Sequence, residues 1–403
     1  MKTLLFMMAS LWTTFVFAIC PGDKETFLKK ALKSLEGIET VSYNEDTKNW
    51  LFGDTLYHEY HRILKEFNNA ADTTIGASFV WWDASDTTLV QGCYDGTLKA
   101  TTWAEDKVVI LDDFTTQNQP IRFITPPFFN HAKSIVRYIL NTQDSISVEF
   151  RELEESYHLR LTIHEDKFVE FFGKPYHMPE SPYSIDDPTS VYELWFNKSD
   201  LLPYKERTEM SYKIIEYICS NVEINKSQIK SIQVADYLPQ GYAVRMKGEK
   251  RDKSPAPSLL GKQAPAWTLN DANDQPVSLS GLKSKVVVLN FTGIGCGPCV
   301  LSIPFLNSIK ELFPAGECEV VSVESWKNKT HSLRVYRDKN RIDYTFLEGN
   351  DAIIKDYLDG KRGVPVFFIL DVKRNVRKII NGYNKETTGE EILKAVKEAL
   401  SAT

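Results

Sequence analysis

The residues best suited to chemistry are two cysteines separated by two positions, in the run Cys296-Gly297-Pro298-Cys299. On the first turn of a helix this spacing brings the two sulfur atoms within disulfide distance, and Pro298 suits a position that has no amide partner. The amides at a helix N-terminus stabilise a thiolate and lower its pKa from about 8.5 towards 7 or below. We therefore expect a redox-active pair in which Cys296 is the nucleophile.

The same pair could instead supply half of a zinc site, which needs two further ligands. Downstream of the pair, His331 and Cys318 are the candidate zinc ligands, and neither belongs to a second pair at metal-ligand spacing. We therefore predict no metal and no other cofactor. A peroxidase would carry a Thr-x-x-Cys motif, whereas Thr292 and Cys296 are separated by three residues, which argues against that activity.

The segments around the pair alternate between two kinds of pattern. Apolar runs typical of strands buried on both faces occupy residues 286–291, 319–323 and 366–370. Helical patterns occupy residues 299–313, 333–339, 351–358 and 390–400. This alternation predicts an α/β domain over residues 259–403, in which Cys296 lies where a buried strand meets a helix.

A series of short motifs accompanies the cysteine pair along this domain. They are Gly261-Lys262, Ala264-Pro265, Trp267, Leu269, Val277-Ser278-Leu279, Leu282-Lys283, residues 287–291, Pro304 and Gly363-Val364-Pro365. In this order they resemble the exported thioredoxins of the TlpA-like group. The resemblance implies a thioredoxin fold with Pro365 in cis against the disulfide. It also implies that Gly297, Pro298, Val364 and Pro365 contact the substrate polypeptide.

The resemblance further implies thiol-disulfide exchange with disulfide-containing proteins of the cell envelope. The Cys296 thiolate would attack a substrate disulfide, and the more buried Cys299 would resolve the mixed disulfide. A membrane electron donor would then reduce the pair again. The Gly-Pro between the cysteines resembles that of reducing thioredoxins, which favours a reductase over the alternative of an oxidase or isomerase.

Three positions depart from the family pattern. Residues 292–295, Thr-Gly-Ile-Gly, stand where an aromatic usually precedes the first cysteine, so we expect a smaller and more flexible platform beside the active site. Asn290 and Ser302 replace the two acids that usually accept the proton of the second cysteine. Glu324 could substitute for them, although its place at a strand end is more typical of a surface carboxylate.

The region upstream, residues 20–247, has a different pattern. Helical periodicity is present at residues 24–35 and 131–140. Segments typical of strands cover residues 75–82, 88–94, 97–103, 107–111, 145–150, 157–163, 168–172, 191–197 and 204–209. Together they predict an α+β domain in which a large antiparallel sheet curls over helices.

One hairpin of this region, residues 192–197 followed by Leu202-Pro203 and residues 204–207, resembles the late hairpin of lipoprotein-carrier (LolA-like) folds. In those folds a curved sheet wraps helices around an apolar cavity, which implies a lipophilic ligand. Trp81, Trp82, Trp195 and Phe196 are nevertheless more typical of an ordinary core. A binding protein with a regulatory or degenerate redox domain is therefore the alternative function.

The N-terminus and the middle of the chain carry two further signals. In residues 1–19, Lys2 is followed by an uncharged, largely apolar run. This pattern predicts a signal peptide, and hence export to the periplasm or cell envelope. In a lipoprotein Cys20 would be acylated, but Ile19 stands where such signals have a small residue. Residues 248–258 are charged and contain Pro-Ala-Pro, which predicts a linker. The net charge of -6 argues against a nucleic-acid partner.

The remaining cysteines and histidines are weaker candidates. Cys93 and Cys219 could pair in an oxidising compartment, or could equally stay free. Cys318 lies beside a buried strand and is typical of an inert thiol. His58 and His61 are three positions apart, one short of a zincin motif, and we expect ordinary surface or strand residues there.

Overall fold

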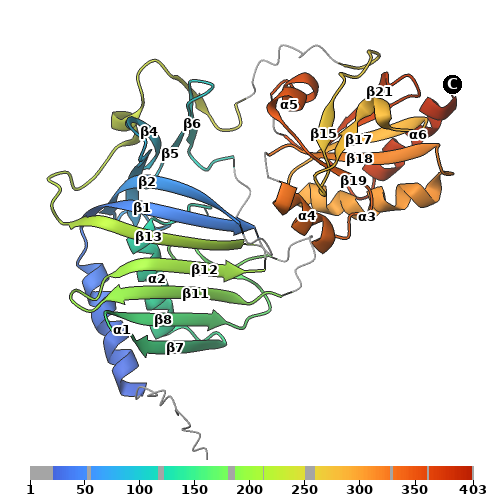
Figure 1. Cartoon of the computed structure of the whole chain (residues 1–403). Helices are drawn as coiled ribbons and strands as arrows, with labels where there is room; N and C mark the ends of the chain where they lie inside the picture. The colour runs from blue at the N-terminus through green and yellow to red at the C-terminus, as the bar shows by residue number, and fades with distance from the viewer. Residues whose placement is uncertain are drawn as a thin grey trace, which may run out of the picture.

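The computed structural model describes residues 21–51, 56–116, 122–179, 187–211, 213–249, 259–326, 330–360 and 363–401. The predicted signal peptide, Cys20 and residues 250–258 of the predicted linker lie outside these ranges. Figure 1 shows a domain dominated by one large sheet and a second domain of sheet and helices. Within the described ranges, each helix is too short or too polar to cross a membrane.

The N-terminal domain is built on a twelve-stranded sheet of order β14-β6-β5-β4-β3-β2-β1-β13-β12-β11-β8-β7. Its strands are β1 (Thr40–Leu51), β2 (Tyr57–Asn68), β3 (Ala77–Asp83), β4 (Asp86–Tyr94), β5 (Lys99–Trp103), β6 (Val108–Asp112), β7 (Ile146–Glu152), β8 (Ser156–Ile163), β11 (Ser190–Asn197), β12 (Pro203–Met210), β13 (Lys213–Ile224) and β14 (Ala243–Met246). Neighbours are antiparallel except for the parallel pair of β14 and β6. A small hairpin, β9 (Val169–Phe171) and β10 (Pro175–His177), lies apart from this sheet.

Two helices cover one face of the large sheet, as Figure 1 shows. They are α1 (Pro21–Glu36) and α2 (Phe128–Asn141), and both confirm helices predicted from periodicity. Apolar side chains of the helices pack against Leu159, Leu161 and Leu194 of the sheet in one continuous core. The predicted antiparallel α+β architecture is therefore present.

The space between these helices and the sheet is filled by side chains. The cavity bounded by Leu35, Ile38, Glu66, Phe129 and other residues of this region measures about 10 Å³. Such a volume holds no more than a single water molecule. The lipophilic ligand suggested by the LolA-like resemblance therefore has no preformed space at this place, and it stays a prediction.

The four aromatic residues predicted to be core residues, Trp81, Trp82, Trp195 and Phe196, do not all lie in the core. Phe196 is fully buried among the residues under the helices, and Trp81 packs beside them. Trp82 packs partly against a second cluster around Val80 and Val109. Trp195 contradicts the prediction, because it lies on the opposite face, stacked on His158 with Lys205 above its ring. The Lys205 ammonium group and the stacked His158 ring cover its indole there.

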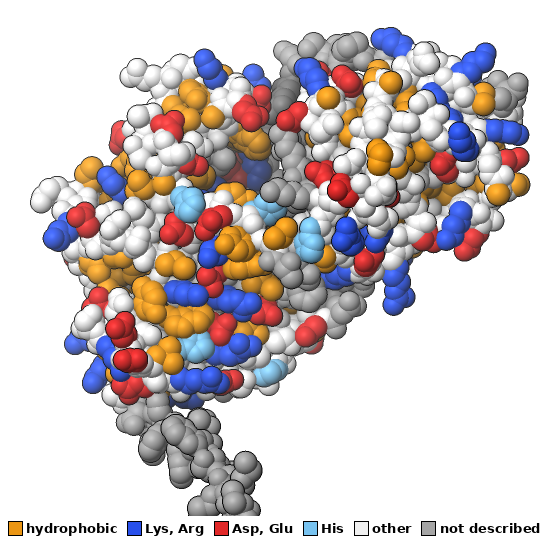
Figure 2. Space-filling model, in the orientation of Figure 1, with side chains coloured by type: hydrophobic (Ala, Val, Ile, Leu, Met, Phe, Trp, Pro, Cys, Tyr) orange, Lys and Arg blue, Asp and Glu red, His pale blue; other side chains and the backbone are white. Residues whose placement is uncertain are grey.

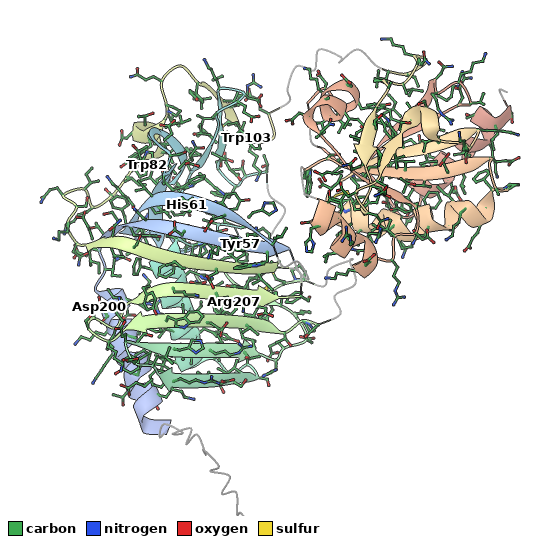
Figure 3. The ribbon with its side chains drawn as sticks, in the orientation of Figure 1. Tyr57, His61, Trp82, Trp103, Asp200 and Arg207 are labelled. Atoms are coloured by element: carbon green, nitrogen blue, oxygen red, sulfur yellow. A yellow bond between two sulfur atoms is a disulfide. The ribbon has the colours of Figure 1, made fainter. Side chains whose placement is uncertain are left out.

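That opposite face carries a row of charges that alternate in sign across seven neighbouring strands. Cross-strand pairing places the following residues in one line: Glu59, Lys48, Glu216, Arg207, Glu193, Arg160 and Glu149. Opposite charges that face each other across strands stabilise a sheet, whereas like charges destabilise it. Figure 2 shows basic and acidic side chains interspersed with apolar ones on this face, and Figure 3 labels Tyr57, His61 and Arg207 on it.

The C-terminal domain has a five-stranded sheet of order β19-β18-β17-β20-β21. Its strands are β17 (Val286–Thr292), β18 (Cys318–Glu324), β19 (Thr345–Glu348), β20 (Val366–Leu370) and β21 (Val376–Asn381), preceded by the hairpin β15 (Thr268–Asn270) and β16 (Pro276–Ser278). The strands β17, β18 and β19 are parallel, whereas β20 and β21 are antiparallel to their neighbours.

Helices cover both faces of this smaller sheet. They are α3 (Gly297–Leu312), α4 (Thr330–Lys339), α5 (Asp351–Leu358) and α6 (Thr388–Ser401). Side chains of α3 and α6 form a core with Val286 and Val288 on one face. Side chains of α5 pack with Val287 and Leu289 on the other face. A strand buried on both faces is therefore apolar at successive positions, which confirms the predicted α/β organisation.

Candidate active site

The cysteine pair lies where β17 leads into α3. Cys296 is the residue before the helix, and Cys299 is in its first turn, with Pro298 at the second helical position. The two cysteines form a disulfide with their Cα atoms 5.2 Å apart. Cys296 is 6% exposed and Cys299 only 1%, so Cys296 is the more accessible sulfur of the pair. The first helical turn thus holds the pair in the arrangement that the sequence predicted.

The loop before β20 lies against the disulfide. The bond between Val364 and Pro365 is cis, as the family resemblance implied. The Sγ atom of Cys296 lies 3.7 Å from the carbonyl oxygen of Val364. The structure therefore brings Val364 next to Cys296, although 68 positions separate them in the chain. Gly297 and Pro298, also predicted to contact substrate, are the first two residues of α3 and lie between the two cysteines in the chain.

The two positions that lack the usual acids are buried and hydrogen-bonded. Asn290 is 1% exposed and donates from Nδ2 to the Ser322 hydroxyl at 2.9 Å. Its Oδ1 atom has no hydrogen-bond partner among the described residues. Ser302 is fully buried, and its hydroxyl donates to the Cys299 carbonyl at 2.7 Å. Neither side chain is a carboxylate, so neither offers the proton acceptor that the family pattern has.

Glu324 is not the surface carboxylate that its position suggested. It is fully buried, and its carboxylate accepts hydrogen bonds from the amides of Ile294, at 3.3 Å, and Trp326, at 3.0 Å. Strand β18 lies between β17 and β19, where Glu324 pairs with Thr292 and Glu348. The end of a central strand is enclosed on both sides, which explains the burial that strand-end position alone did not indicate.

An aromatic side chain does lie beside the active-site loop, but it comes from another part of the chain. The Trp326 indole packs so closely on Gly293 that a Cβ atom there would lie 2.5 Å from it. Residue 293 must therefore lack a side chain if the indole is to keep this place. The sequence predicted a smaller platform because no aromatic directly precedes Cys296, and the structure supplies an aromatic from the segment after β18 instead.

The other three cysteines within the described residues are buried and free. Cys93, on β4, and Cys219, on β13, belong to different hydrophobic clusters and form no disulfide, so of the two alternatives left open by the sequence the structure shows free thiols. Cys318 pairs with Val286, at the opposite end of β17 from the active-site loop, so it cannot join Cys296 in a metal site. Burial raises the pKa of the Cys93 and Cys318 thiols to about 12. These thiols are therefore unreactive in the folded protein.

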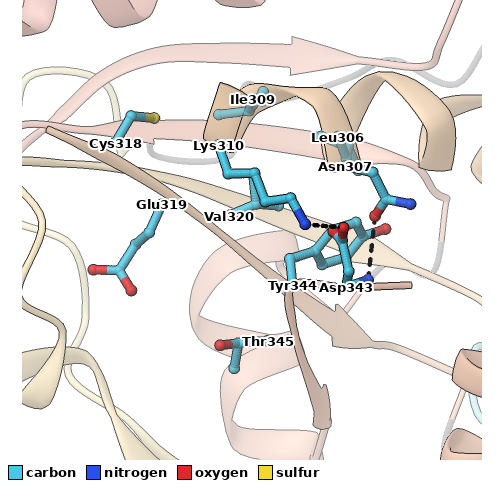
Figure 4. Close-up of a pocket in the computed structure, with 10 residues that line it drawn as sticks. All are labelled: Leu306, Asn307, Ile309, Lys310, Cys318, Glu319, Val320, Asp343, Tyr344 and Thr345. Carbon is cyan, nitrogen blue, oxygen red and sulfur yellow. Dashed lines mark hydrogen bonds and ion pairs between the residues drawn. The ribbon is translucent and has the colours of Figure 1, made fainter. Parts of the chain in front are cut away.

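A pocket of about 210 Å³ lies near the other end of α3, between that helix, β18 and the start of β19. Figure 4 shows the Lys310–Asp343 ion pair and the hydrogen bond from the Asp343 amide to Asn307 in this pocket. None of the predicted site residues lines it. This hollow is therefore separate from the cysteine pair at the N-terminus of α3.

The mixed sheet with helices on both faces, together with a disulfide-bonded Cys-x-x-Cys pair at the start of α3, defines a thioredoxin-fold domain. The family model described as Redoxin matches residues 259–397. Two curated relatives are thiol-disulfide oxidoreductases ResA. That of Geobacillus thermodenitrificans is 27% identical over 141 residues, which are 34% of this chain and 78% of that protein. That of Bacillus subtilis is 26% identical over 137 residues, or 34% and 75%.

Among solved structures, a thiol:disulfide interchange protein of the thioredoxin family from Chlorobium tepidum aligns with 37% of this chain and 99% of its own, with 23% identity and a TM-score of 0.31. By its Redoxin match and its curated relatives, the C-terminal domain resembles the thiol-disulfide oxidoreductases ResA, and it carries a Cys-x-x-Cys pair. The Redoxin match begins at residue 259, so the LolA-like resemblance of the N-terminal domain stays a prediction.

Proposed function

We propose that this protein is an exported thiol-disulfide oxidoreductase that reduces or exchanges disulfides in proteins of the cell envelope. The observation that carries the proposal is the Cys296–Cys299 disulfide at the N-terminus of α3, beside the Val364 carbonyl. Similarity to the thiol-disulfide oxidoreductases ResA supports the same reaction class. Gly297, Pro298, Val364 and Pro365 form the surface that we expect to meet the substrate.

The reaction begins from the reduced pair. The Cys296 thiolate attacks one sulfur of the substrate disulfide, so a mixed disulfide forms and the other substrate sulfur leaves as a thiolate that takes up a proton. Cys299 then loses its proton and attacks Cys296, which releases the second substrate thiol. Two electrons pass to the substrate, and the 296/299 pair ends oxidised. A membrane electron donor must return two electrons before the next cycle.

The direction of electron flow is tested by the reduction potential of the pair. The full chain is equilibrated in graded thiol buffers, and the alkylated mass is measured, with Cys296→Ser as the control. A value near or below about -220 mV supports a reductase, whereas a value above about -180 mV supports an oxidant or isomerase. If no disulfide forms between these residues at any potential, the redox function is wrong and a binding protein becomes the better account.

Export rests on residues 1–19 and needs a separate test. Expression of the full chain in a bacterial host, followed by cell fractionation and intact-mass measurement, distinguishes the two fates. We expect the mature protein to lack residues 1–19 and to be found in the envelope fraction. An added lipid mass on Cys20 would identify a lipoprotein, and an uncleaved cytoplasmic protein would contradict export.

A further inference from the structure

We propose that Trp326 is a substrate-docking residue that binds an apolar side chain next to the reacting cysteine of a substrate polypeptide. This inference rests on the proposed function, since it names what the Cys296 site binds while it exchanges disulfides. The Val364 carbonyl offers a polar contact beside Cys296, and Trp326 would add a large apolar contact.

The position of the indole links it to the reactive cysteine. Trp326 packs directly on Gly293, and the Gly293 carbonyl accepts a hydrogen bond from the Cys296 amide at 3.1 Å. Gly293, which contacts the indole, is therefore one backbone turn away from the nucleophile Cys296. A polypeptide whose disulfide reaches Cys296 must bring its neighbouring residues close to this loop.

The accessibility of the indole sets it apart from the other tryptophan of the domain. Trp267 is 8% exposed and belongs to the core, whereas Trp326 is 38% exposed. Tryptophan is among the residues enriched at the centre of interfaces, and its rigid ring offers a large apolar area to a partner. The exposed part of Trp326 is therefore suited to an apolar side chain of the substrate.

The indole is also held in place before any substrate arrives. The Glu324 carboxylate accepts hydrogen bonds from the amides of Ile294 and Trp326, so it ties the two segments to each other. The Gly349 amide donates to the Glu324 carbonyl at 3.0 Å, which fixes the same strand end from the other side. A docking group that is already ordered loses little conformational entropy on binding.

The test compares Trp326→Ala with Leu312→Ala in the full chain. Leu312 is a suitable control, because it is an exposed apolar residue of the same domain at the last position of α3. Each protein is first reduced, then mixed with one of three disulfides: a cyclic peptide with Phe next to its cysteine, the same peptide with Ser there, and hydroxyethyl disulfide. The second-order rate constant of thiol-disulfide exchange is measured for each.

We expect Trp326→Ala to slow exchange with the Phe peptide about tenfold, the size of effect typical of an aromatic docking residue. Exchange with hydroxyethyl disulfide and the reduction potential of the pair should stay unchanged. Trp326→Phe should retain most of the rate with the Phe peptide, and Leu312→Ala should change none of the rates.

Four results would overturn the inference. Equal loss of rate with all three disulfides, or a shifted potential, would show that Trp326 acts on the cysteine pair itself. No loss with the Phe peptide would show that the indole binds nothing. Equal rate constants of the unaltered protein with the Phe and Ser peptides would also show that the indole binds no apolar side chain. A protein that exchanges with none of the disulfides would instead contradict the proposed function.

A second variant keeps the inference testable if Trp326→Ala folds poorly. In Gly293→Ala the new Cβ atom would lie 2.5 Å from the indole, so the indole must move. We expect the same selective loss with the Phe peptide, and no further loss in the double variant, because both changes remove one contact. Additive losses would contradict a shared contact.

Discussion

The two cysteines of the active site differ in exposure, and this difference predicts different outcomes when each is replaced. Cys296→Ser removes the accessible nucleophile, so we expect disulfide exchange to fall at least roughly 10²-fold. Cys299→Ser keeps the nucleophile but cannot resolve the mixed disulfide, so the substrate stays attached. Non-reducing electrophoresis and mass spectrometry measure both outcomes. If Cys296→Ser stayed active and formed the mixed disulfide on Cys299, then Cys299 would be the nucleophile and Cys296 the resolving cysteine.

Glu324 is the buried residue whose role differs most from its sequence-based expectation. Replacing it with Gln keeps one acceptor oxygen but turns an amide donor towards a backbone N–H, so one hydrogen bond is lost. We expect hydrogen exchange at the amides of Ile294 and Trp326 to become roughly tenfold faster, which corresponds to about 1.4 kcal/mol.

The control for this change is Glu311→Gln, which alters an exposed carboxylate of α3. Exchange in the segments 292–296 and 322–326 is followed by mass spectrometry in the full chain for both variants. Unchanged exchange in Glu324→Gln would contradict the bridging role of this carboxylate between the two segments.

At the scale of elements, the row of alternating charges predicts how the large sheet responds to acid. A hydrogen bond from His158 and the charges of Arg160 and Arg207 lower the pKa of Glu193 to about 2. The unfolded value is about 4.3, so ionised Glu193 stabilises the folded domain above that pH. This stabilisation is lost as the pH falls from about 4.3 to 2.

We therefore expect Glu193→Gln to lower the free energy of unfolding of the N-terminal domain by about 2 to 3 kcal/mol at pH 7, and by little near pH 2. Urea unfolding followed by tryptophan fluorescence at several pH values measures the difference. Glu149→Gln, at the exposed end of the same row, should change little at either pH. A loss in Glu193→Gln that is independent of pH would contradict the electrostatic cause.

Predicting elements from sequence succeeded where the pattern was apolar and failed where it was not. The helices α1 and α2 were recognised because their apolar residues follow helical spacing. The strands β1, β2 and β13 at the middle of the large sheet were not. Their helix-facing side includes Glu45, Thr47 and Glu66, all nearly buried. Burial raises the pKa of Glu45 and Glu66 to about 7, and such polar inward positions hide the alternation that identifies a strand.

At the scale of the whole molecule, each domain has its own cores. The clusters around α1, α2 and the large sheet include only residues of the N-terminal domain, and those around β17 include only residues of the C-terminal domain. Domains with separate cores unfold as separate units. We therefore expect two calorimetric transitions for the full chain.

Reduction of the Cys296–Cys299 disulfide should lower the temperature of one transition and leave the other unchanged. The double variant with Ser at both positions should show the same single shift, and it should not respond to reductant. A single transition that shifts as a whole would show that the two domains are coupled more strongly than their cores indicate.

Residue spacing along the chain was enough to predict the reaction class and the local geometry of the cysteine pair. The spacing of Cys296 and Cys299 is a property of one helical turn, and the buried strand before it is apolar at every position but Asn290 and Thr292. Both features depend on neighbours in the chain. For that reason they were predictable without any knowledge of the rest of the fold.

The surroundings of the pair depend on how the strands and helices pack in three dimensions. The parallel pairing of β17 with β18 sets Thr292 opposite Glu324, and so brings Glu324 and Trp326 to the loop before Cys296. Likewise, Cys93 and Cys219 stay apart because their strands hold them in different cores. Contacts between residues far apart in the chain depend on strand order and register, and residue spacing carries no direct record of either.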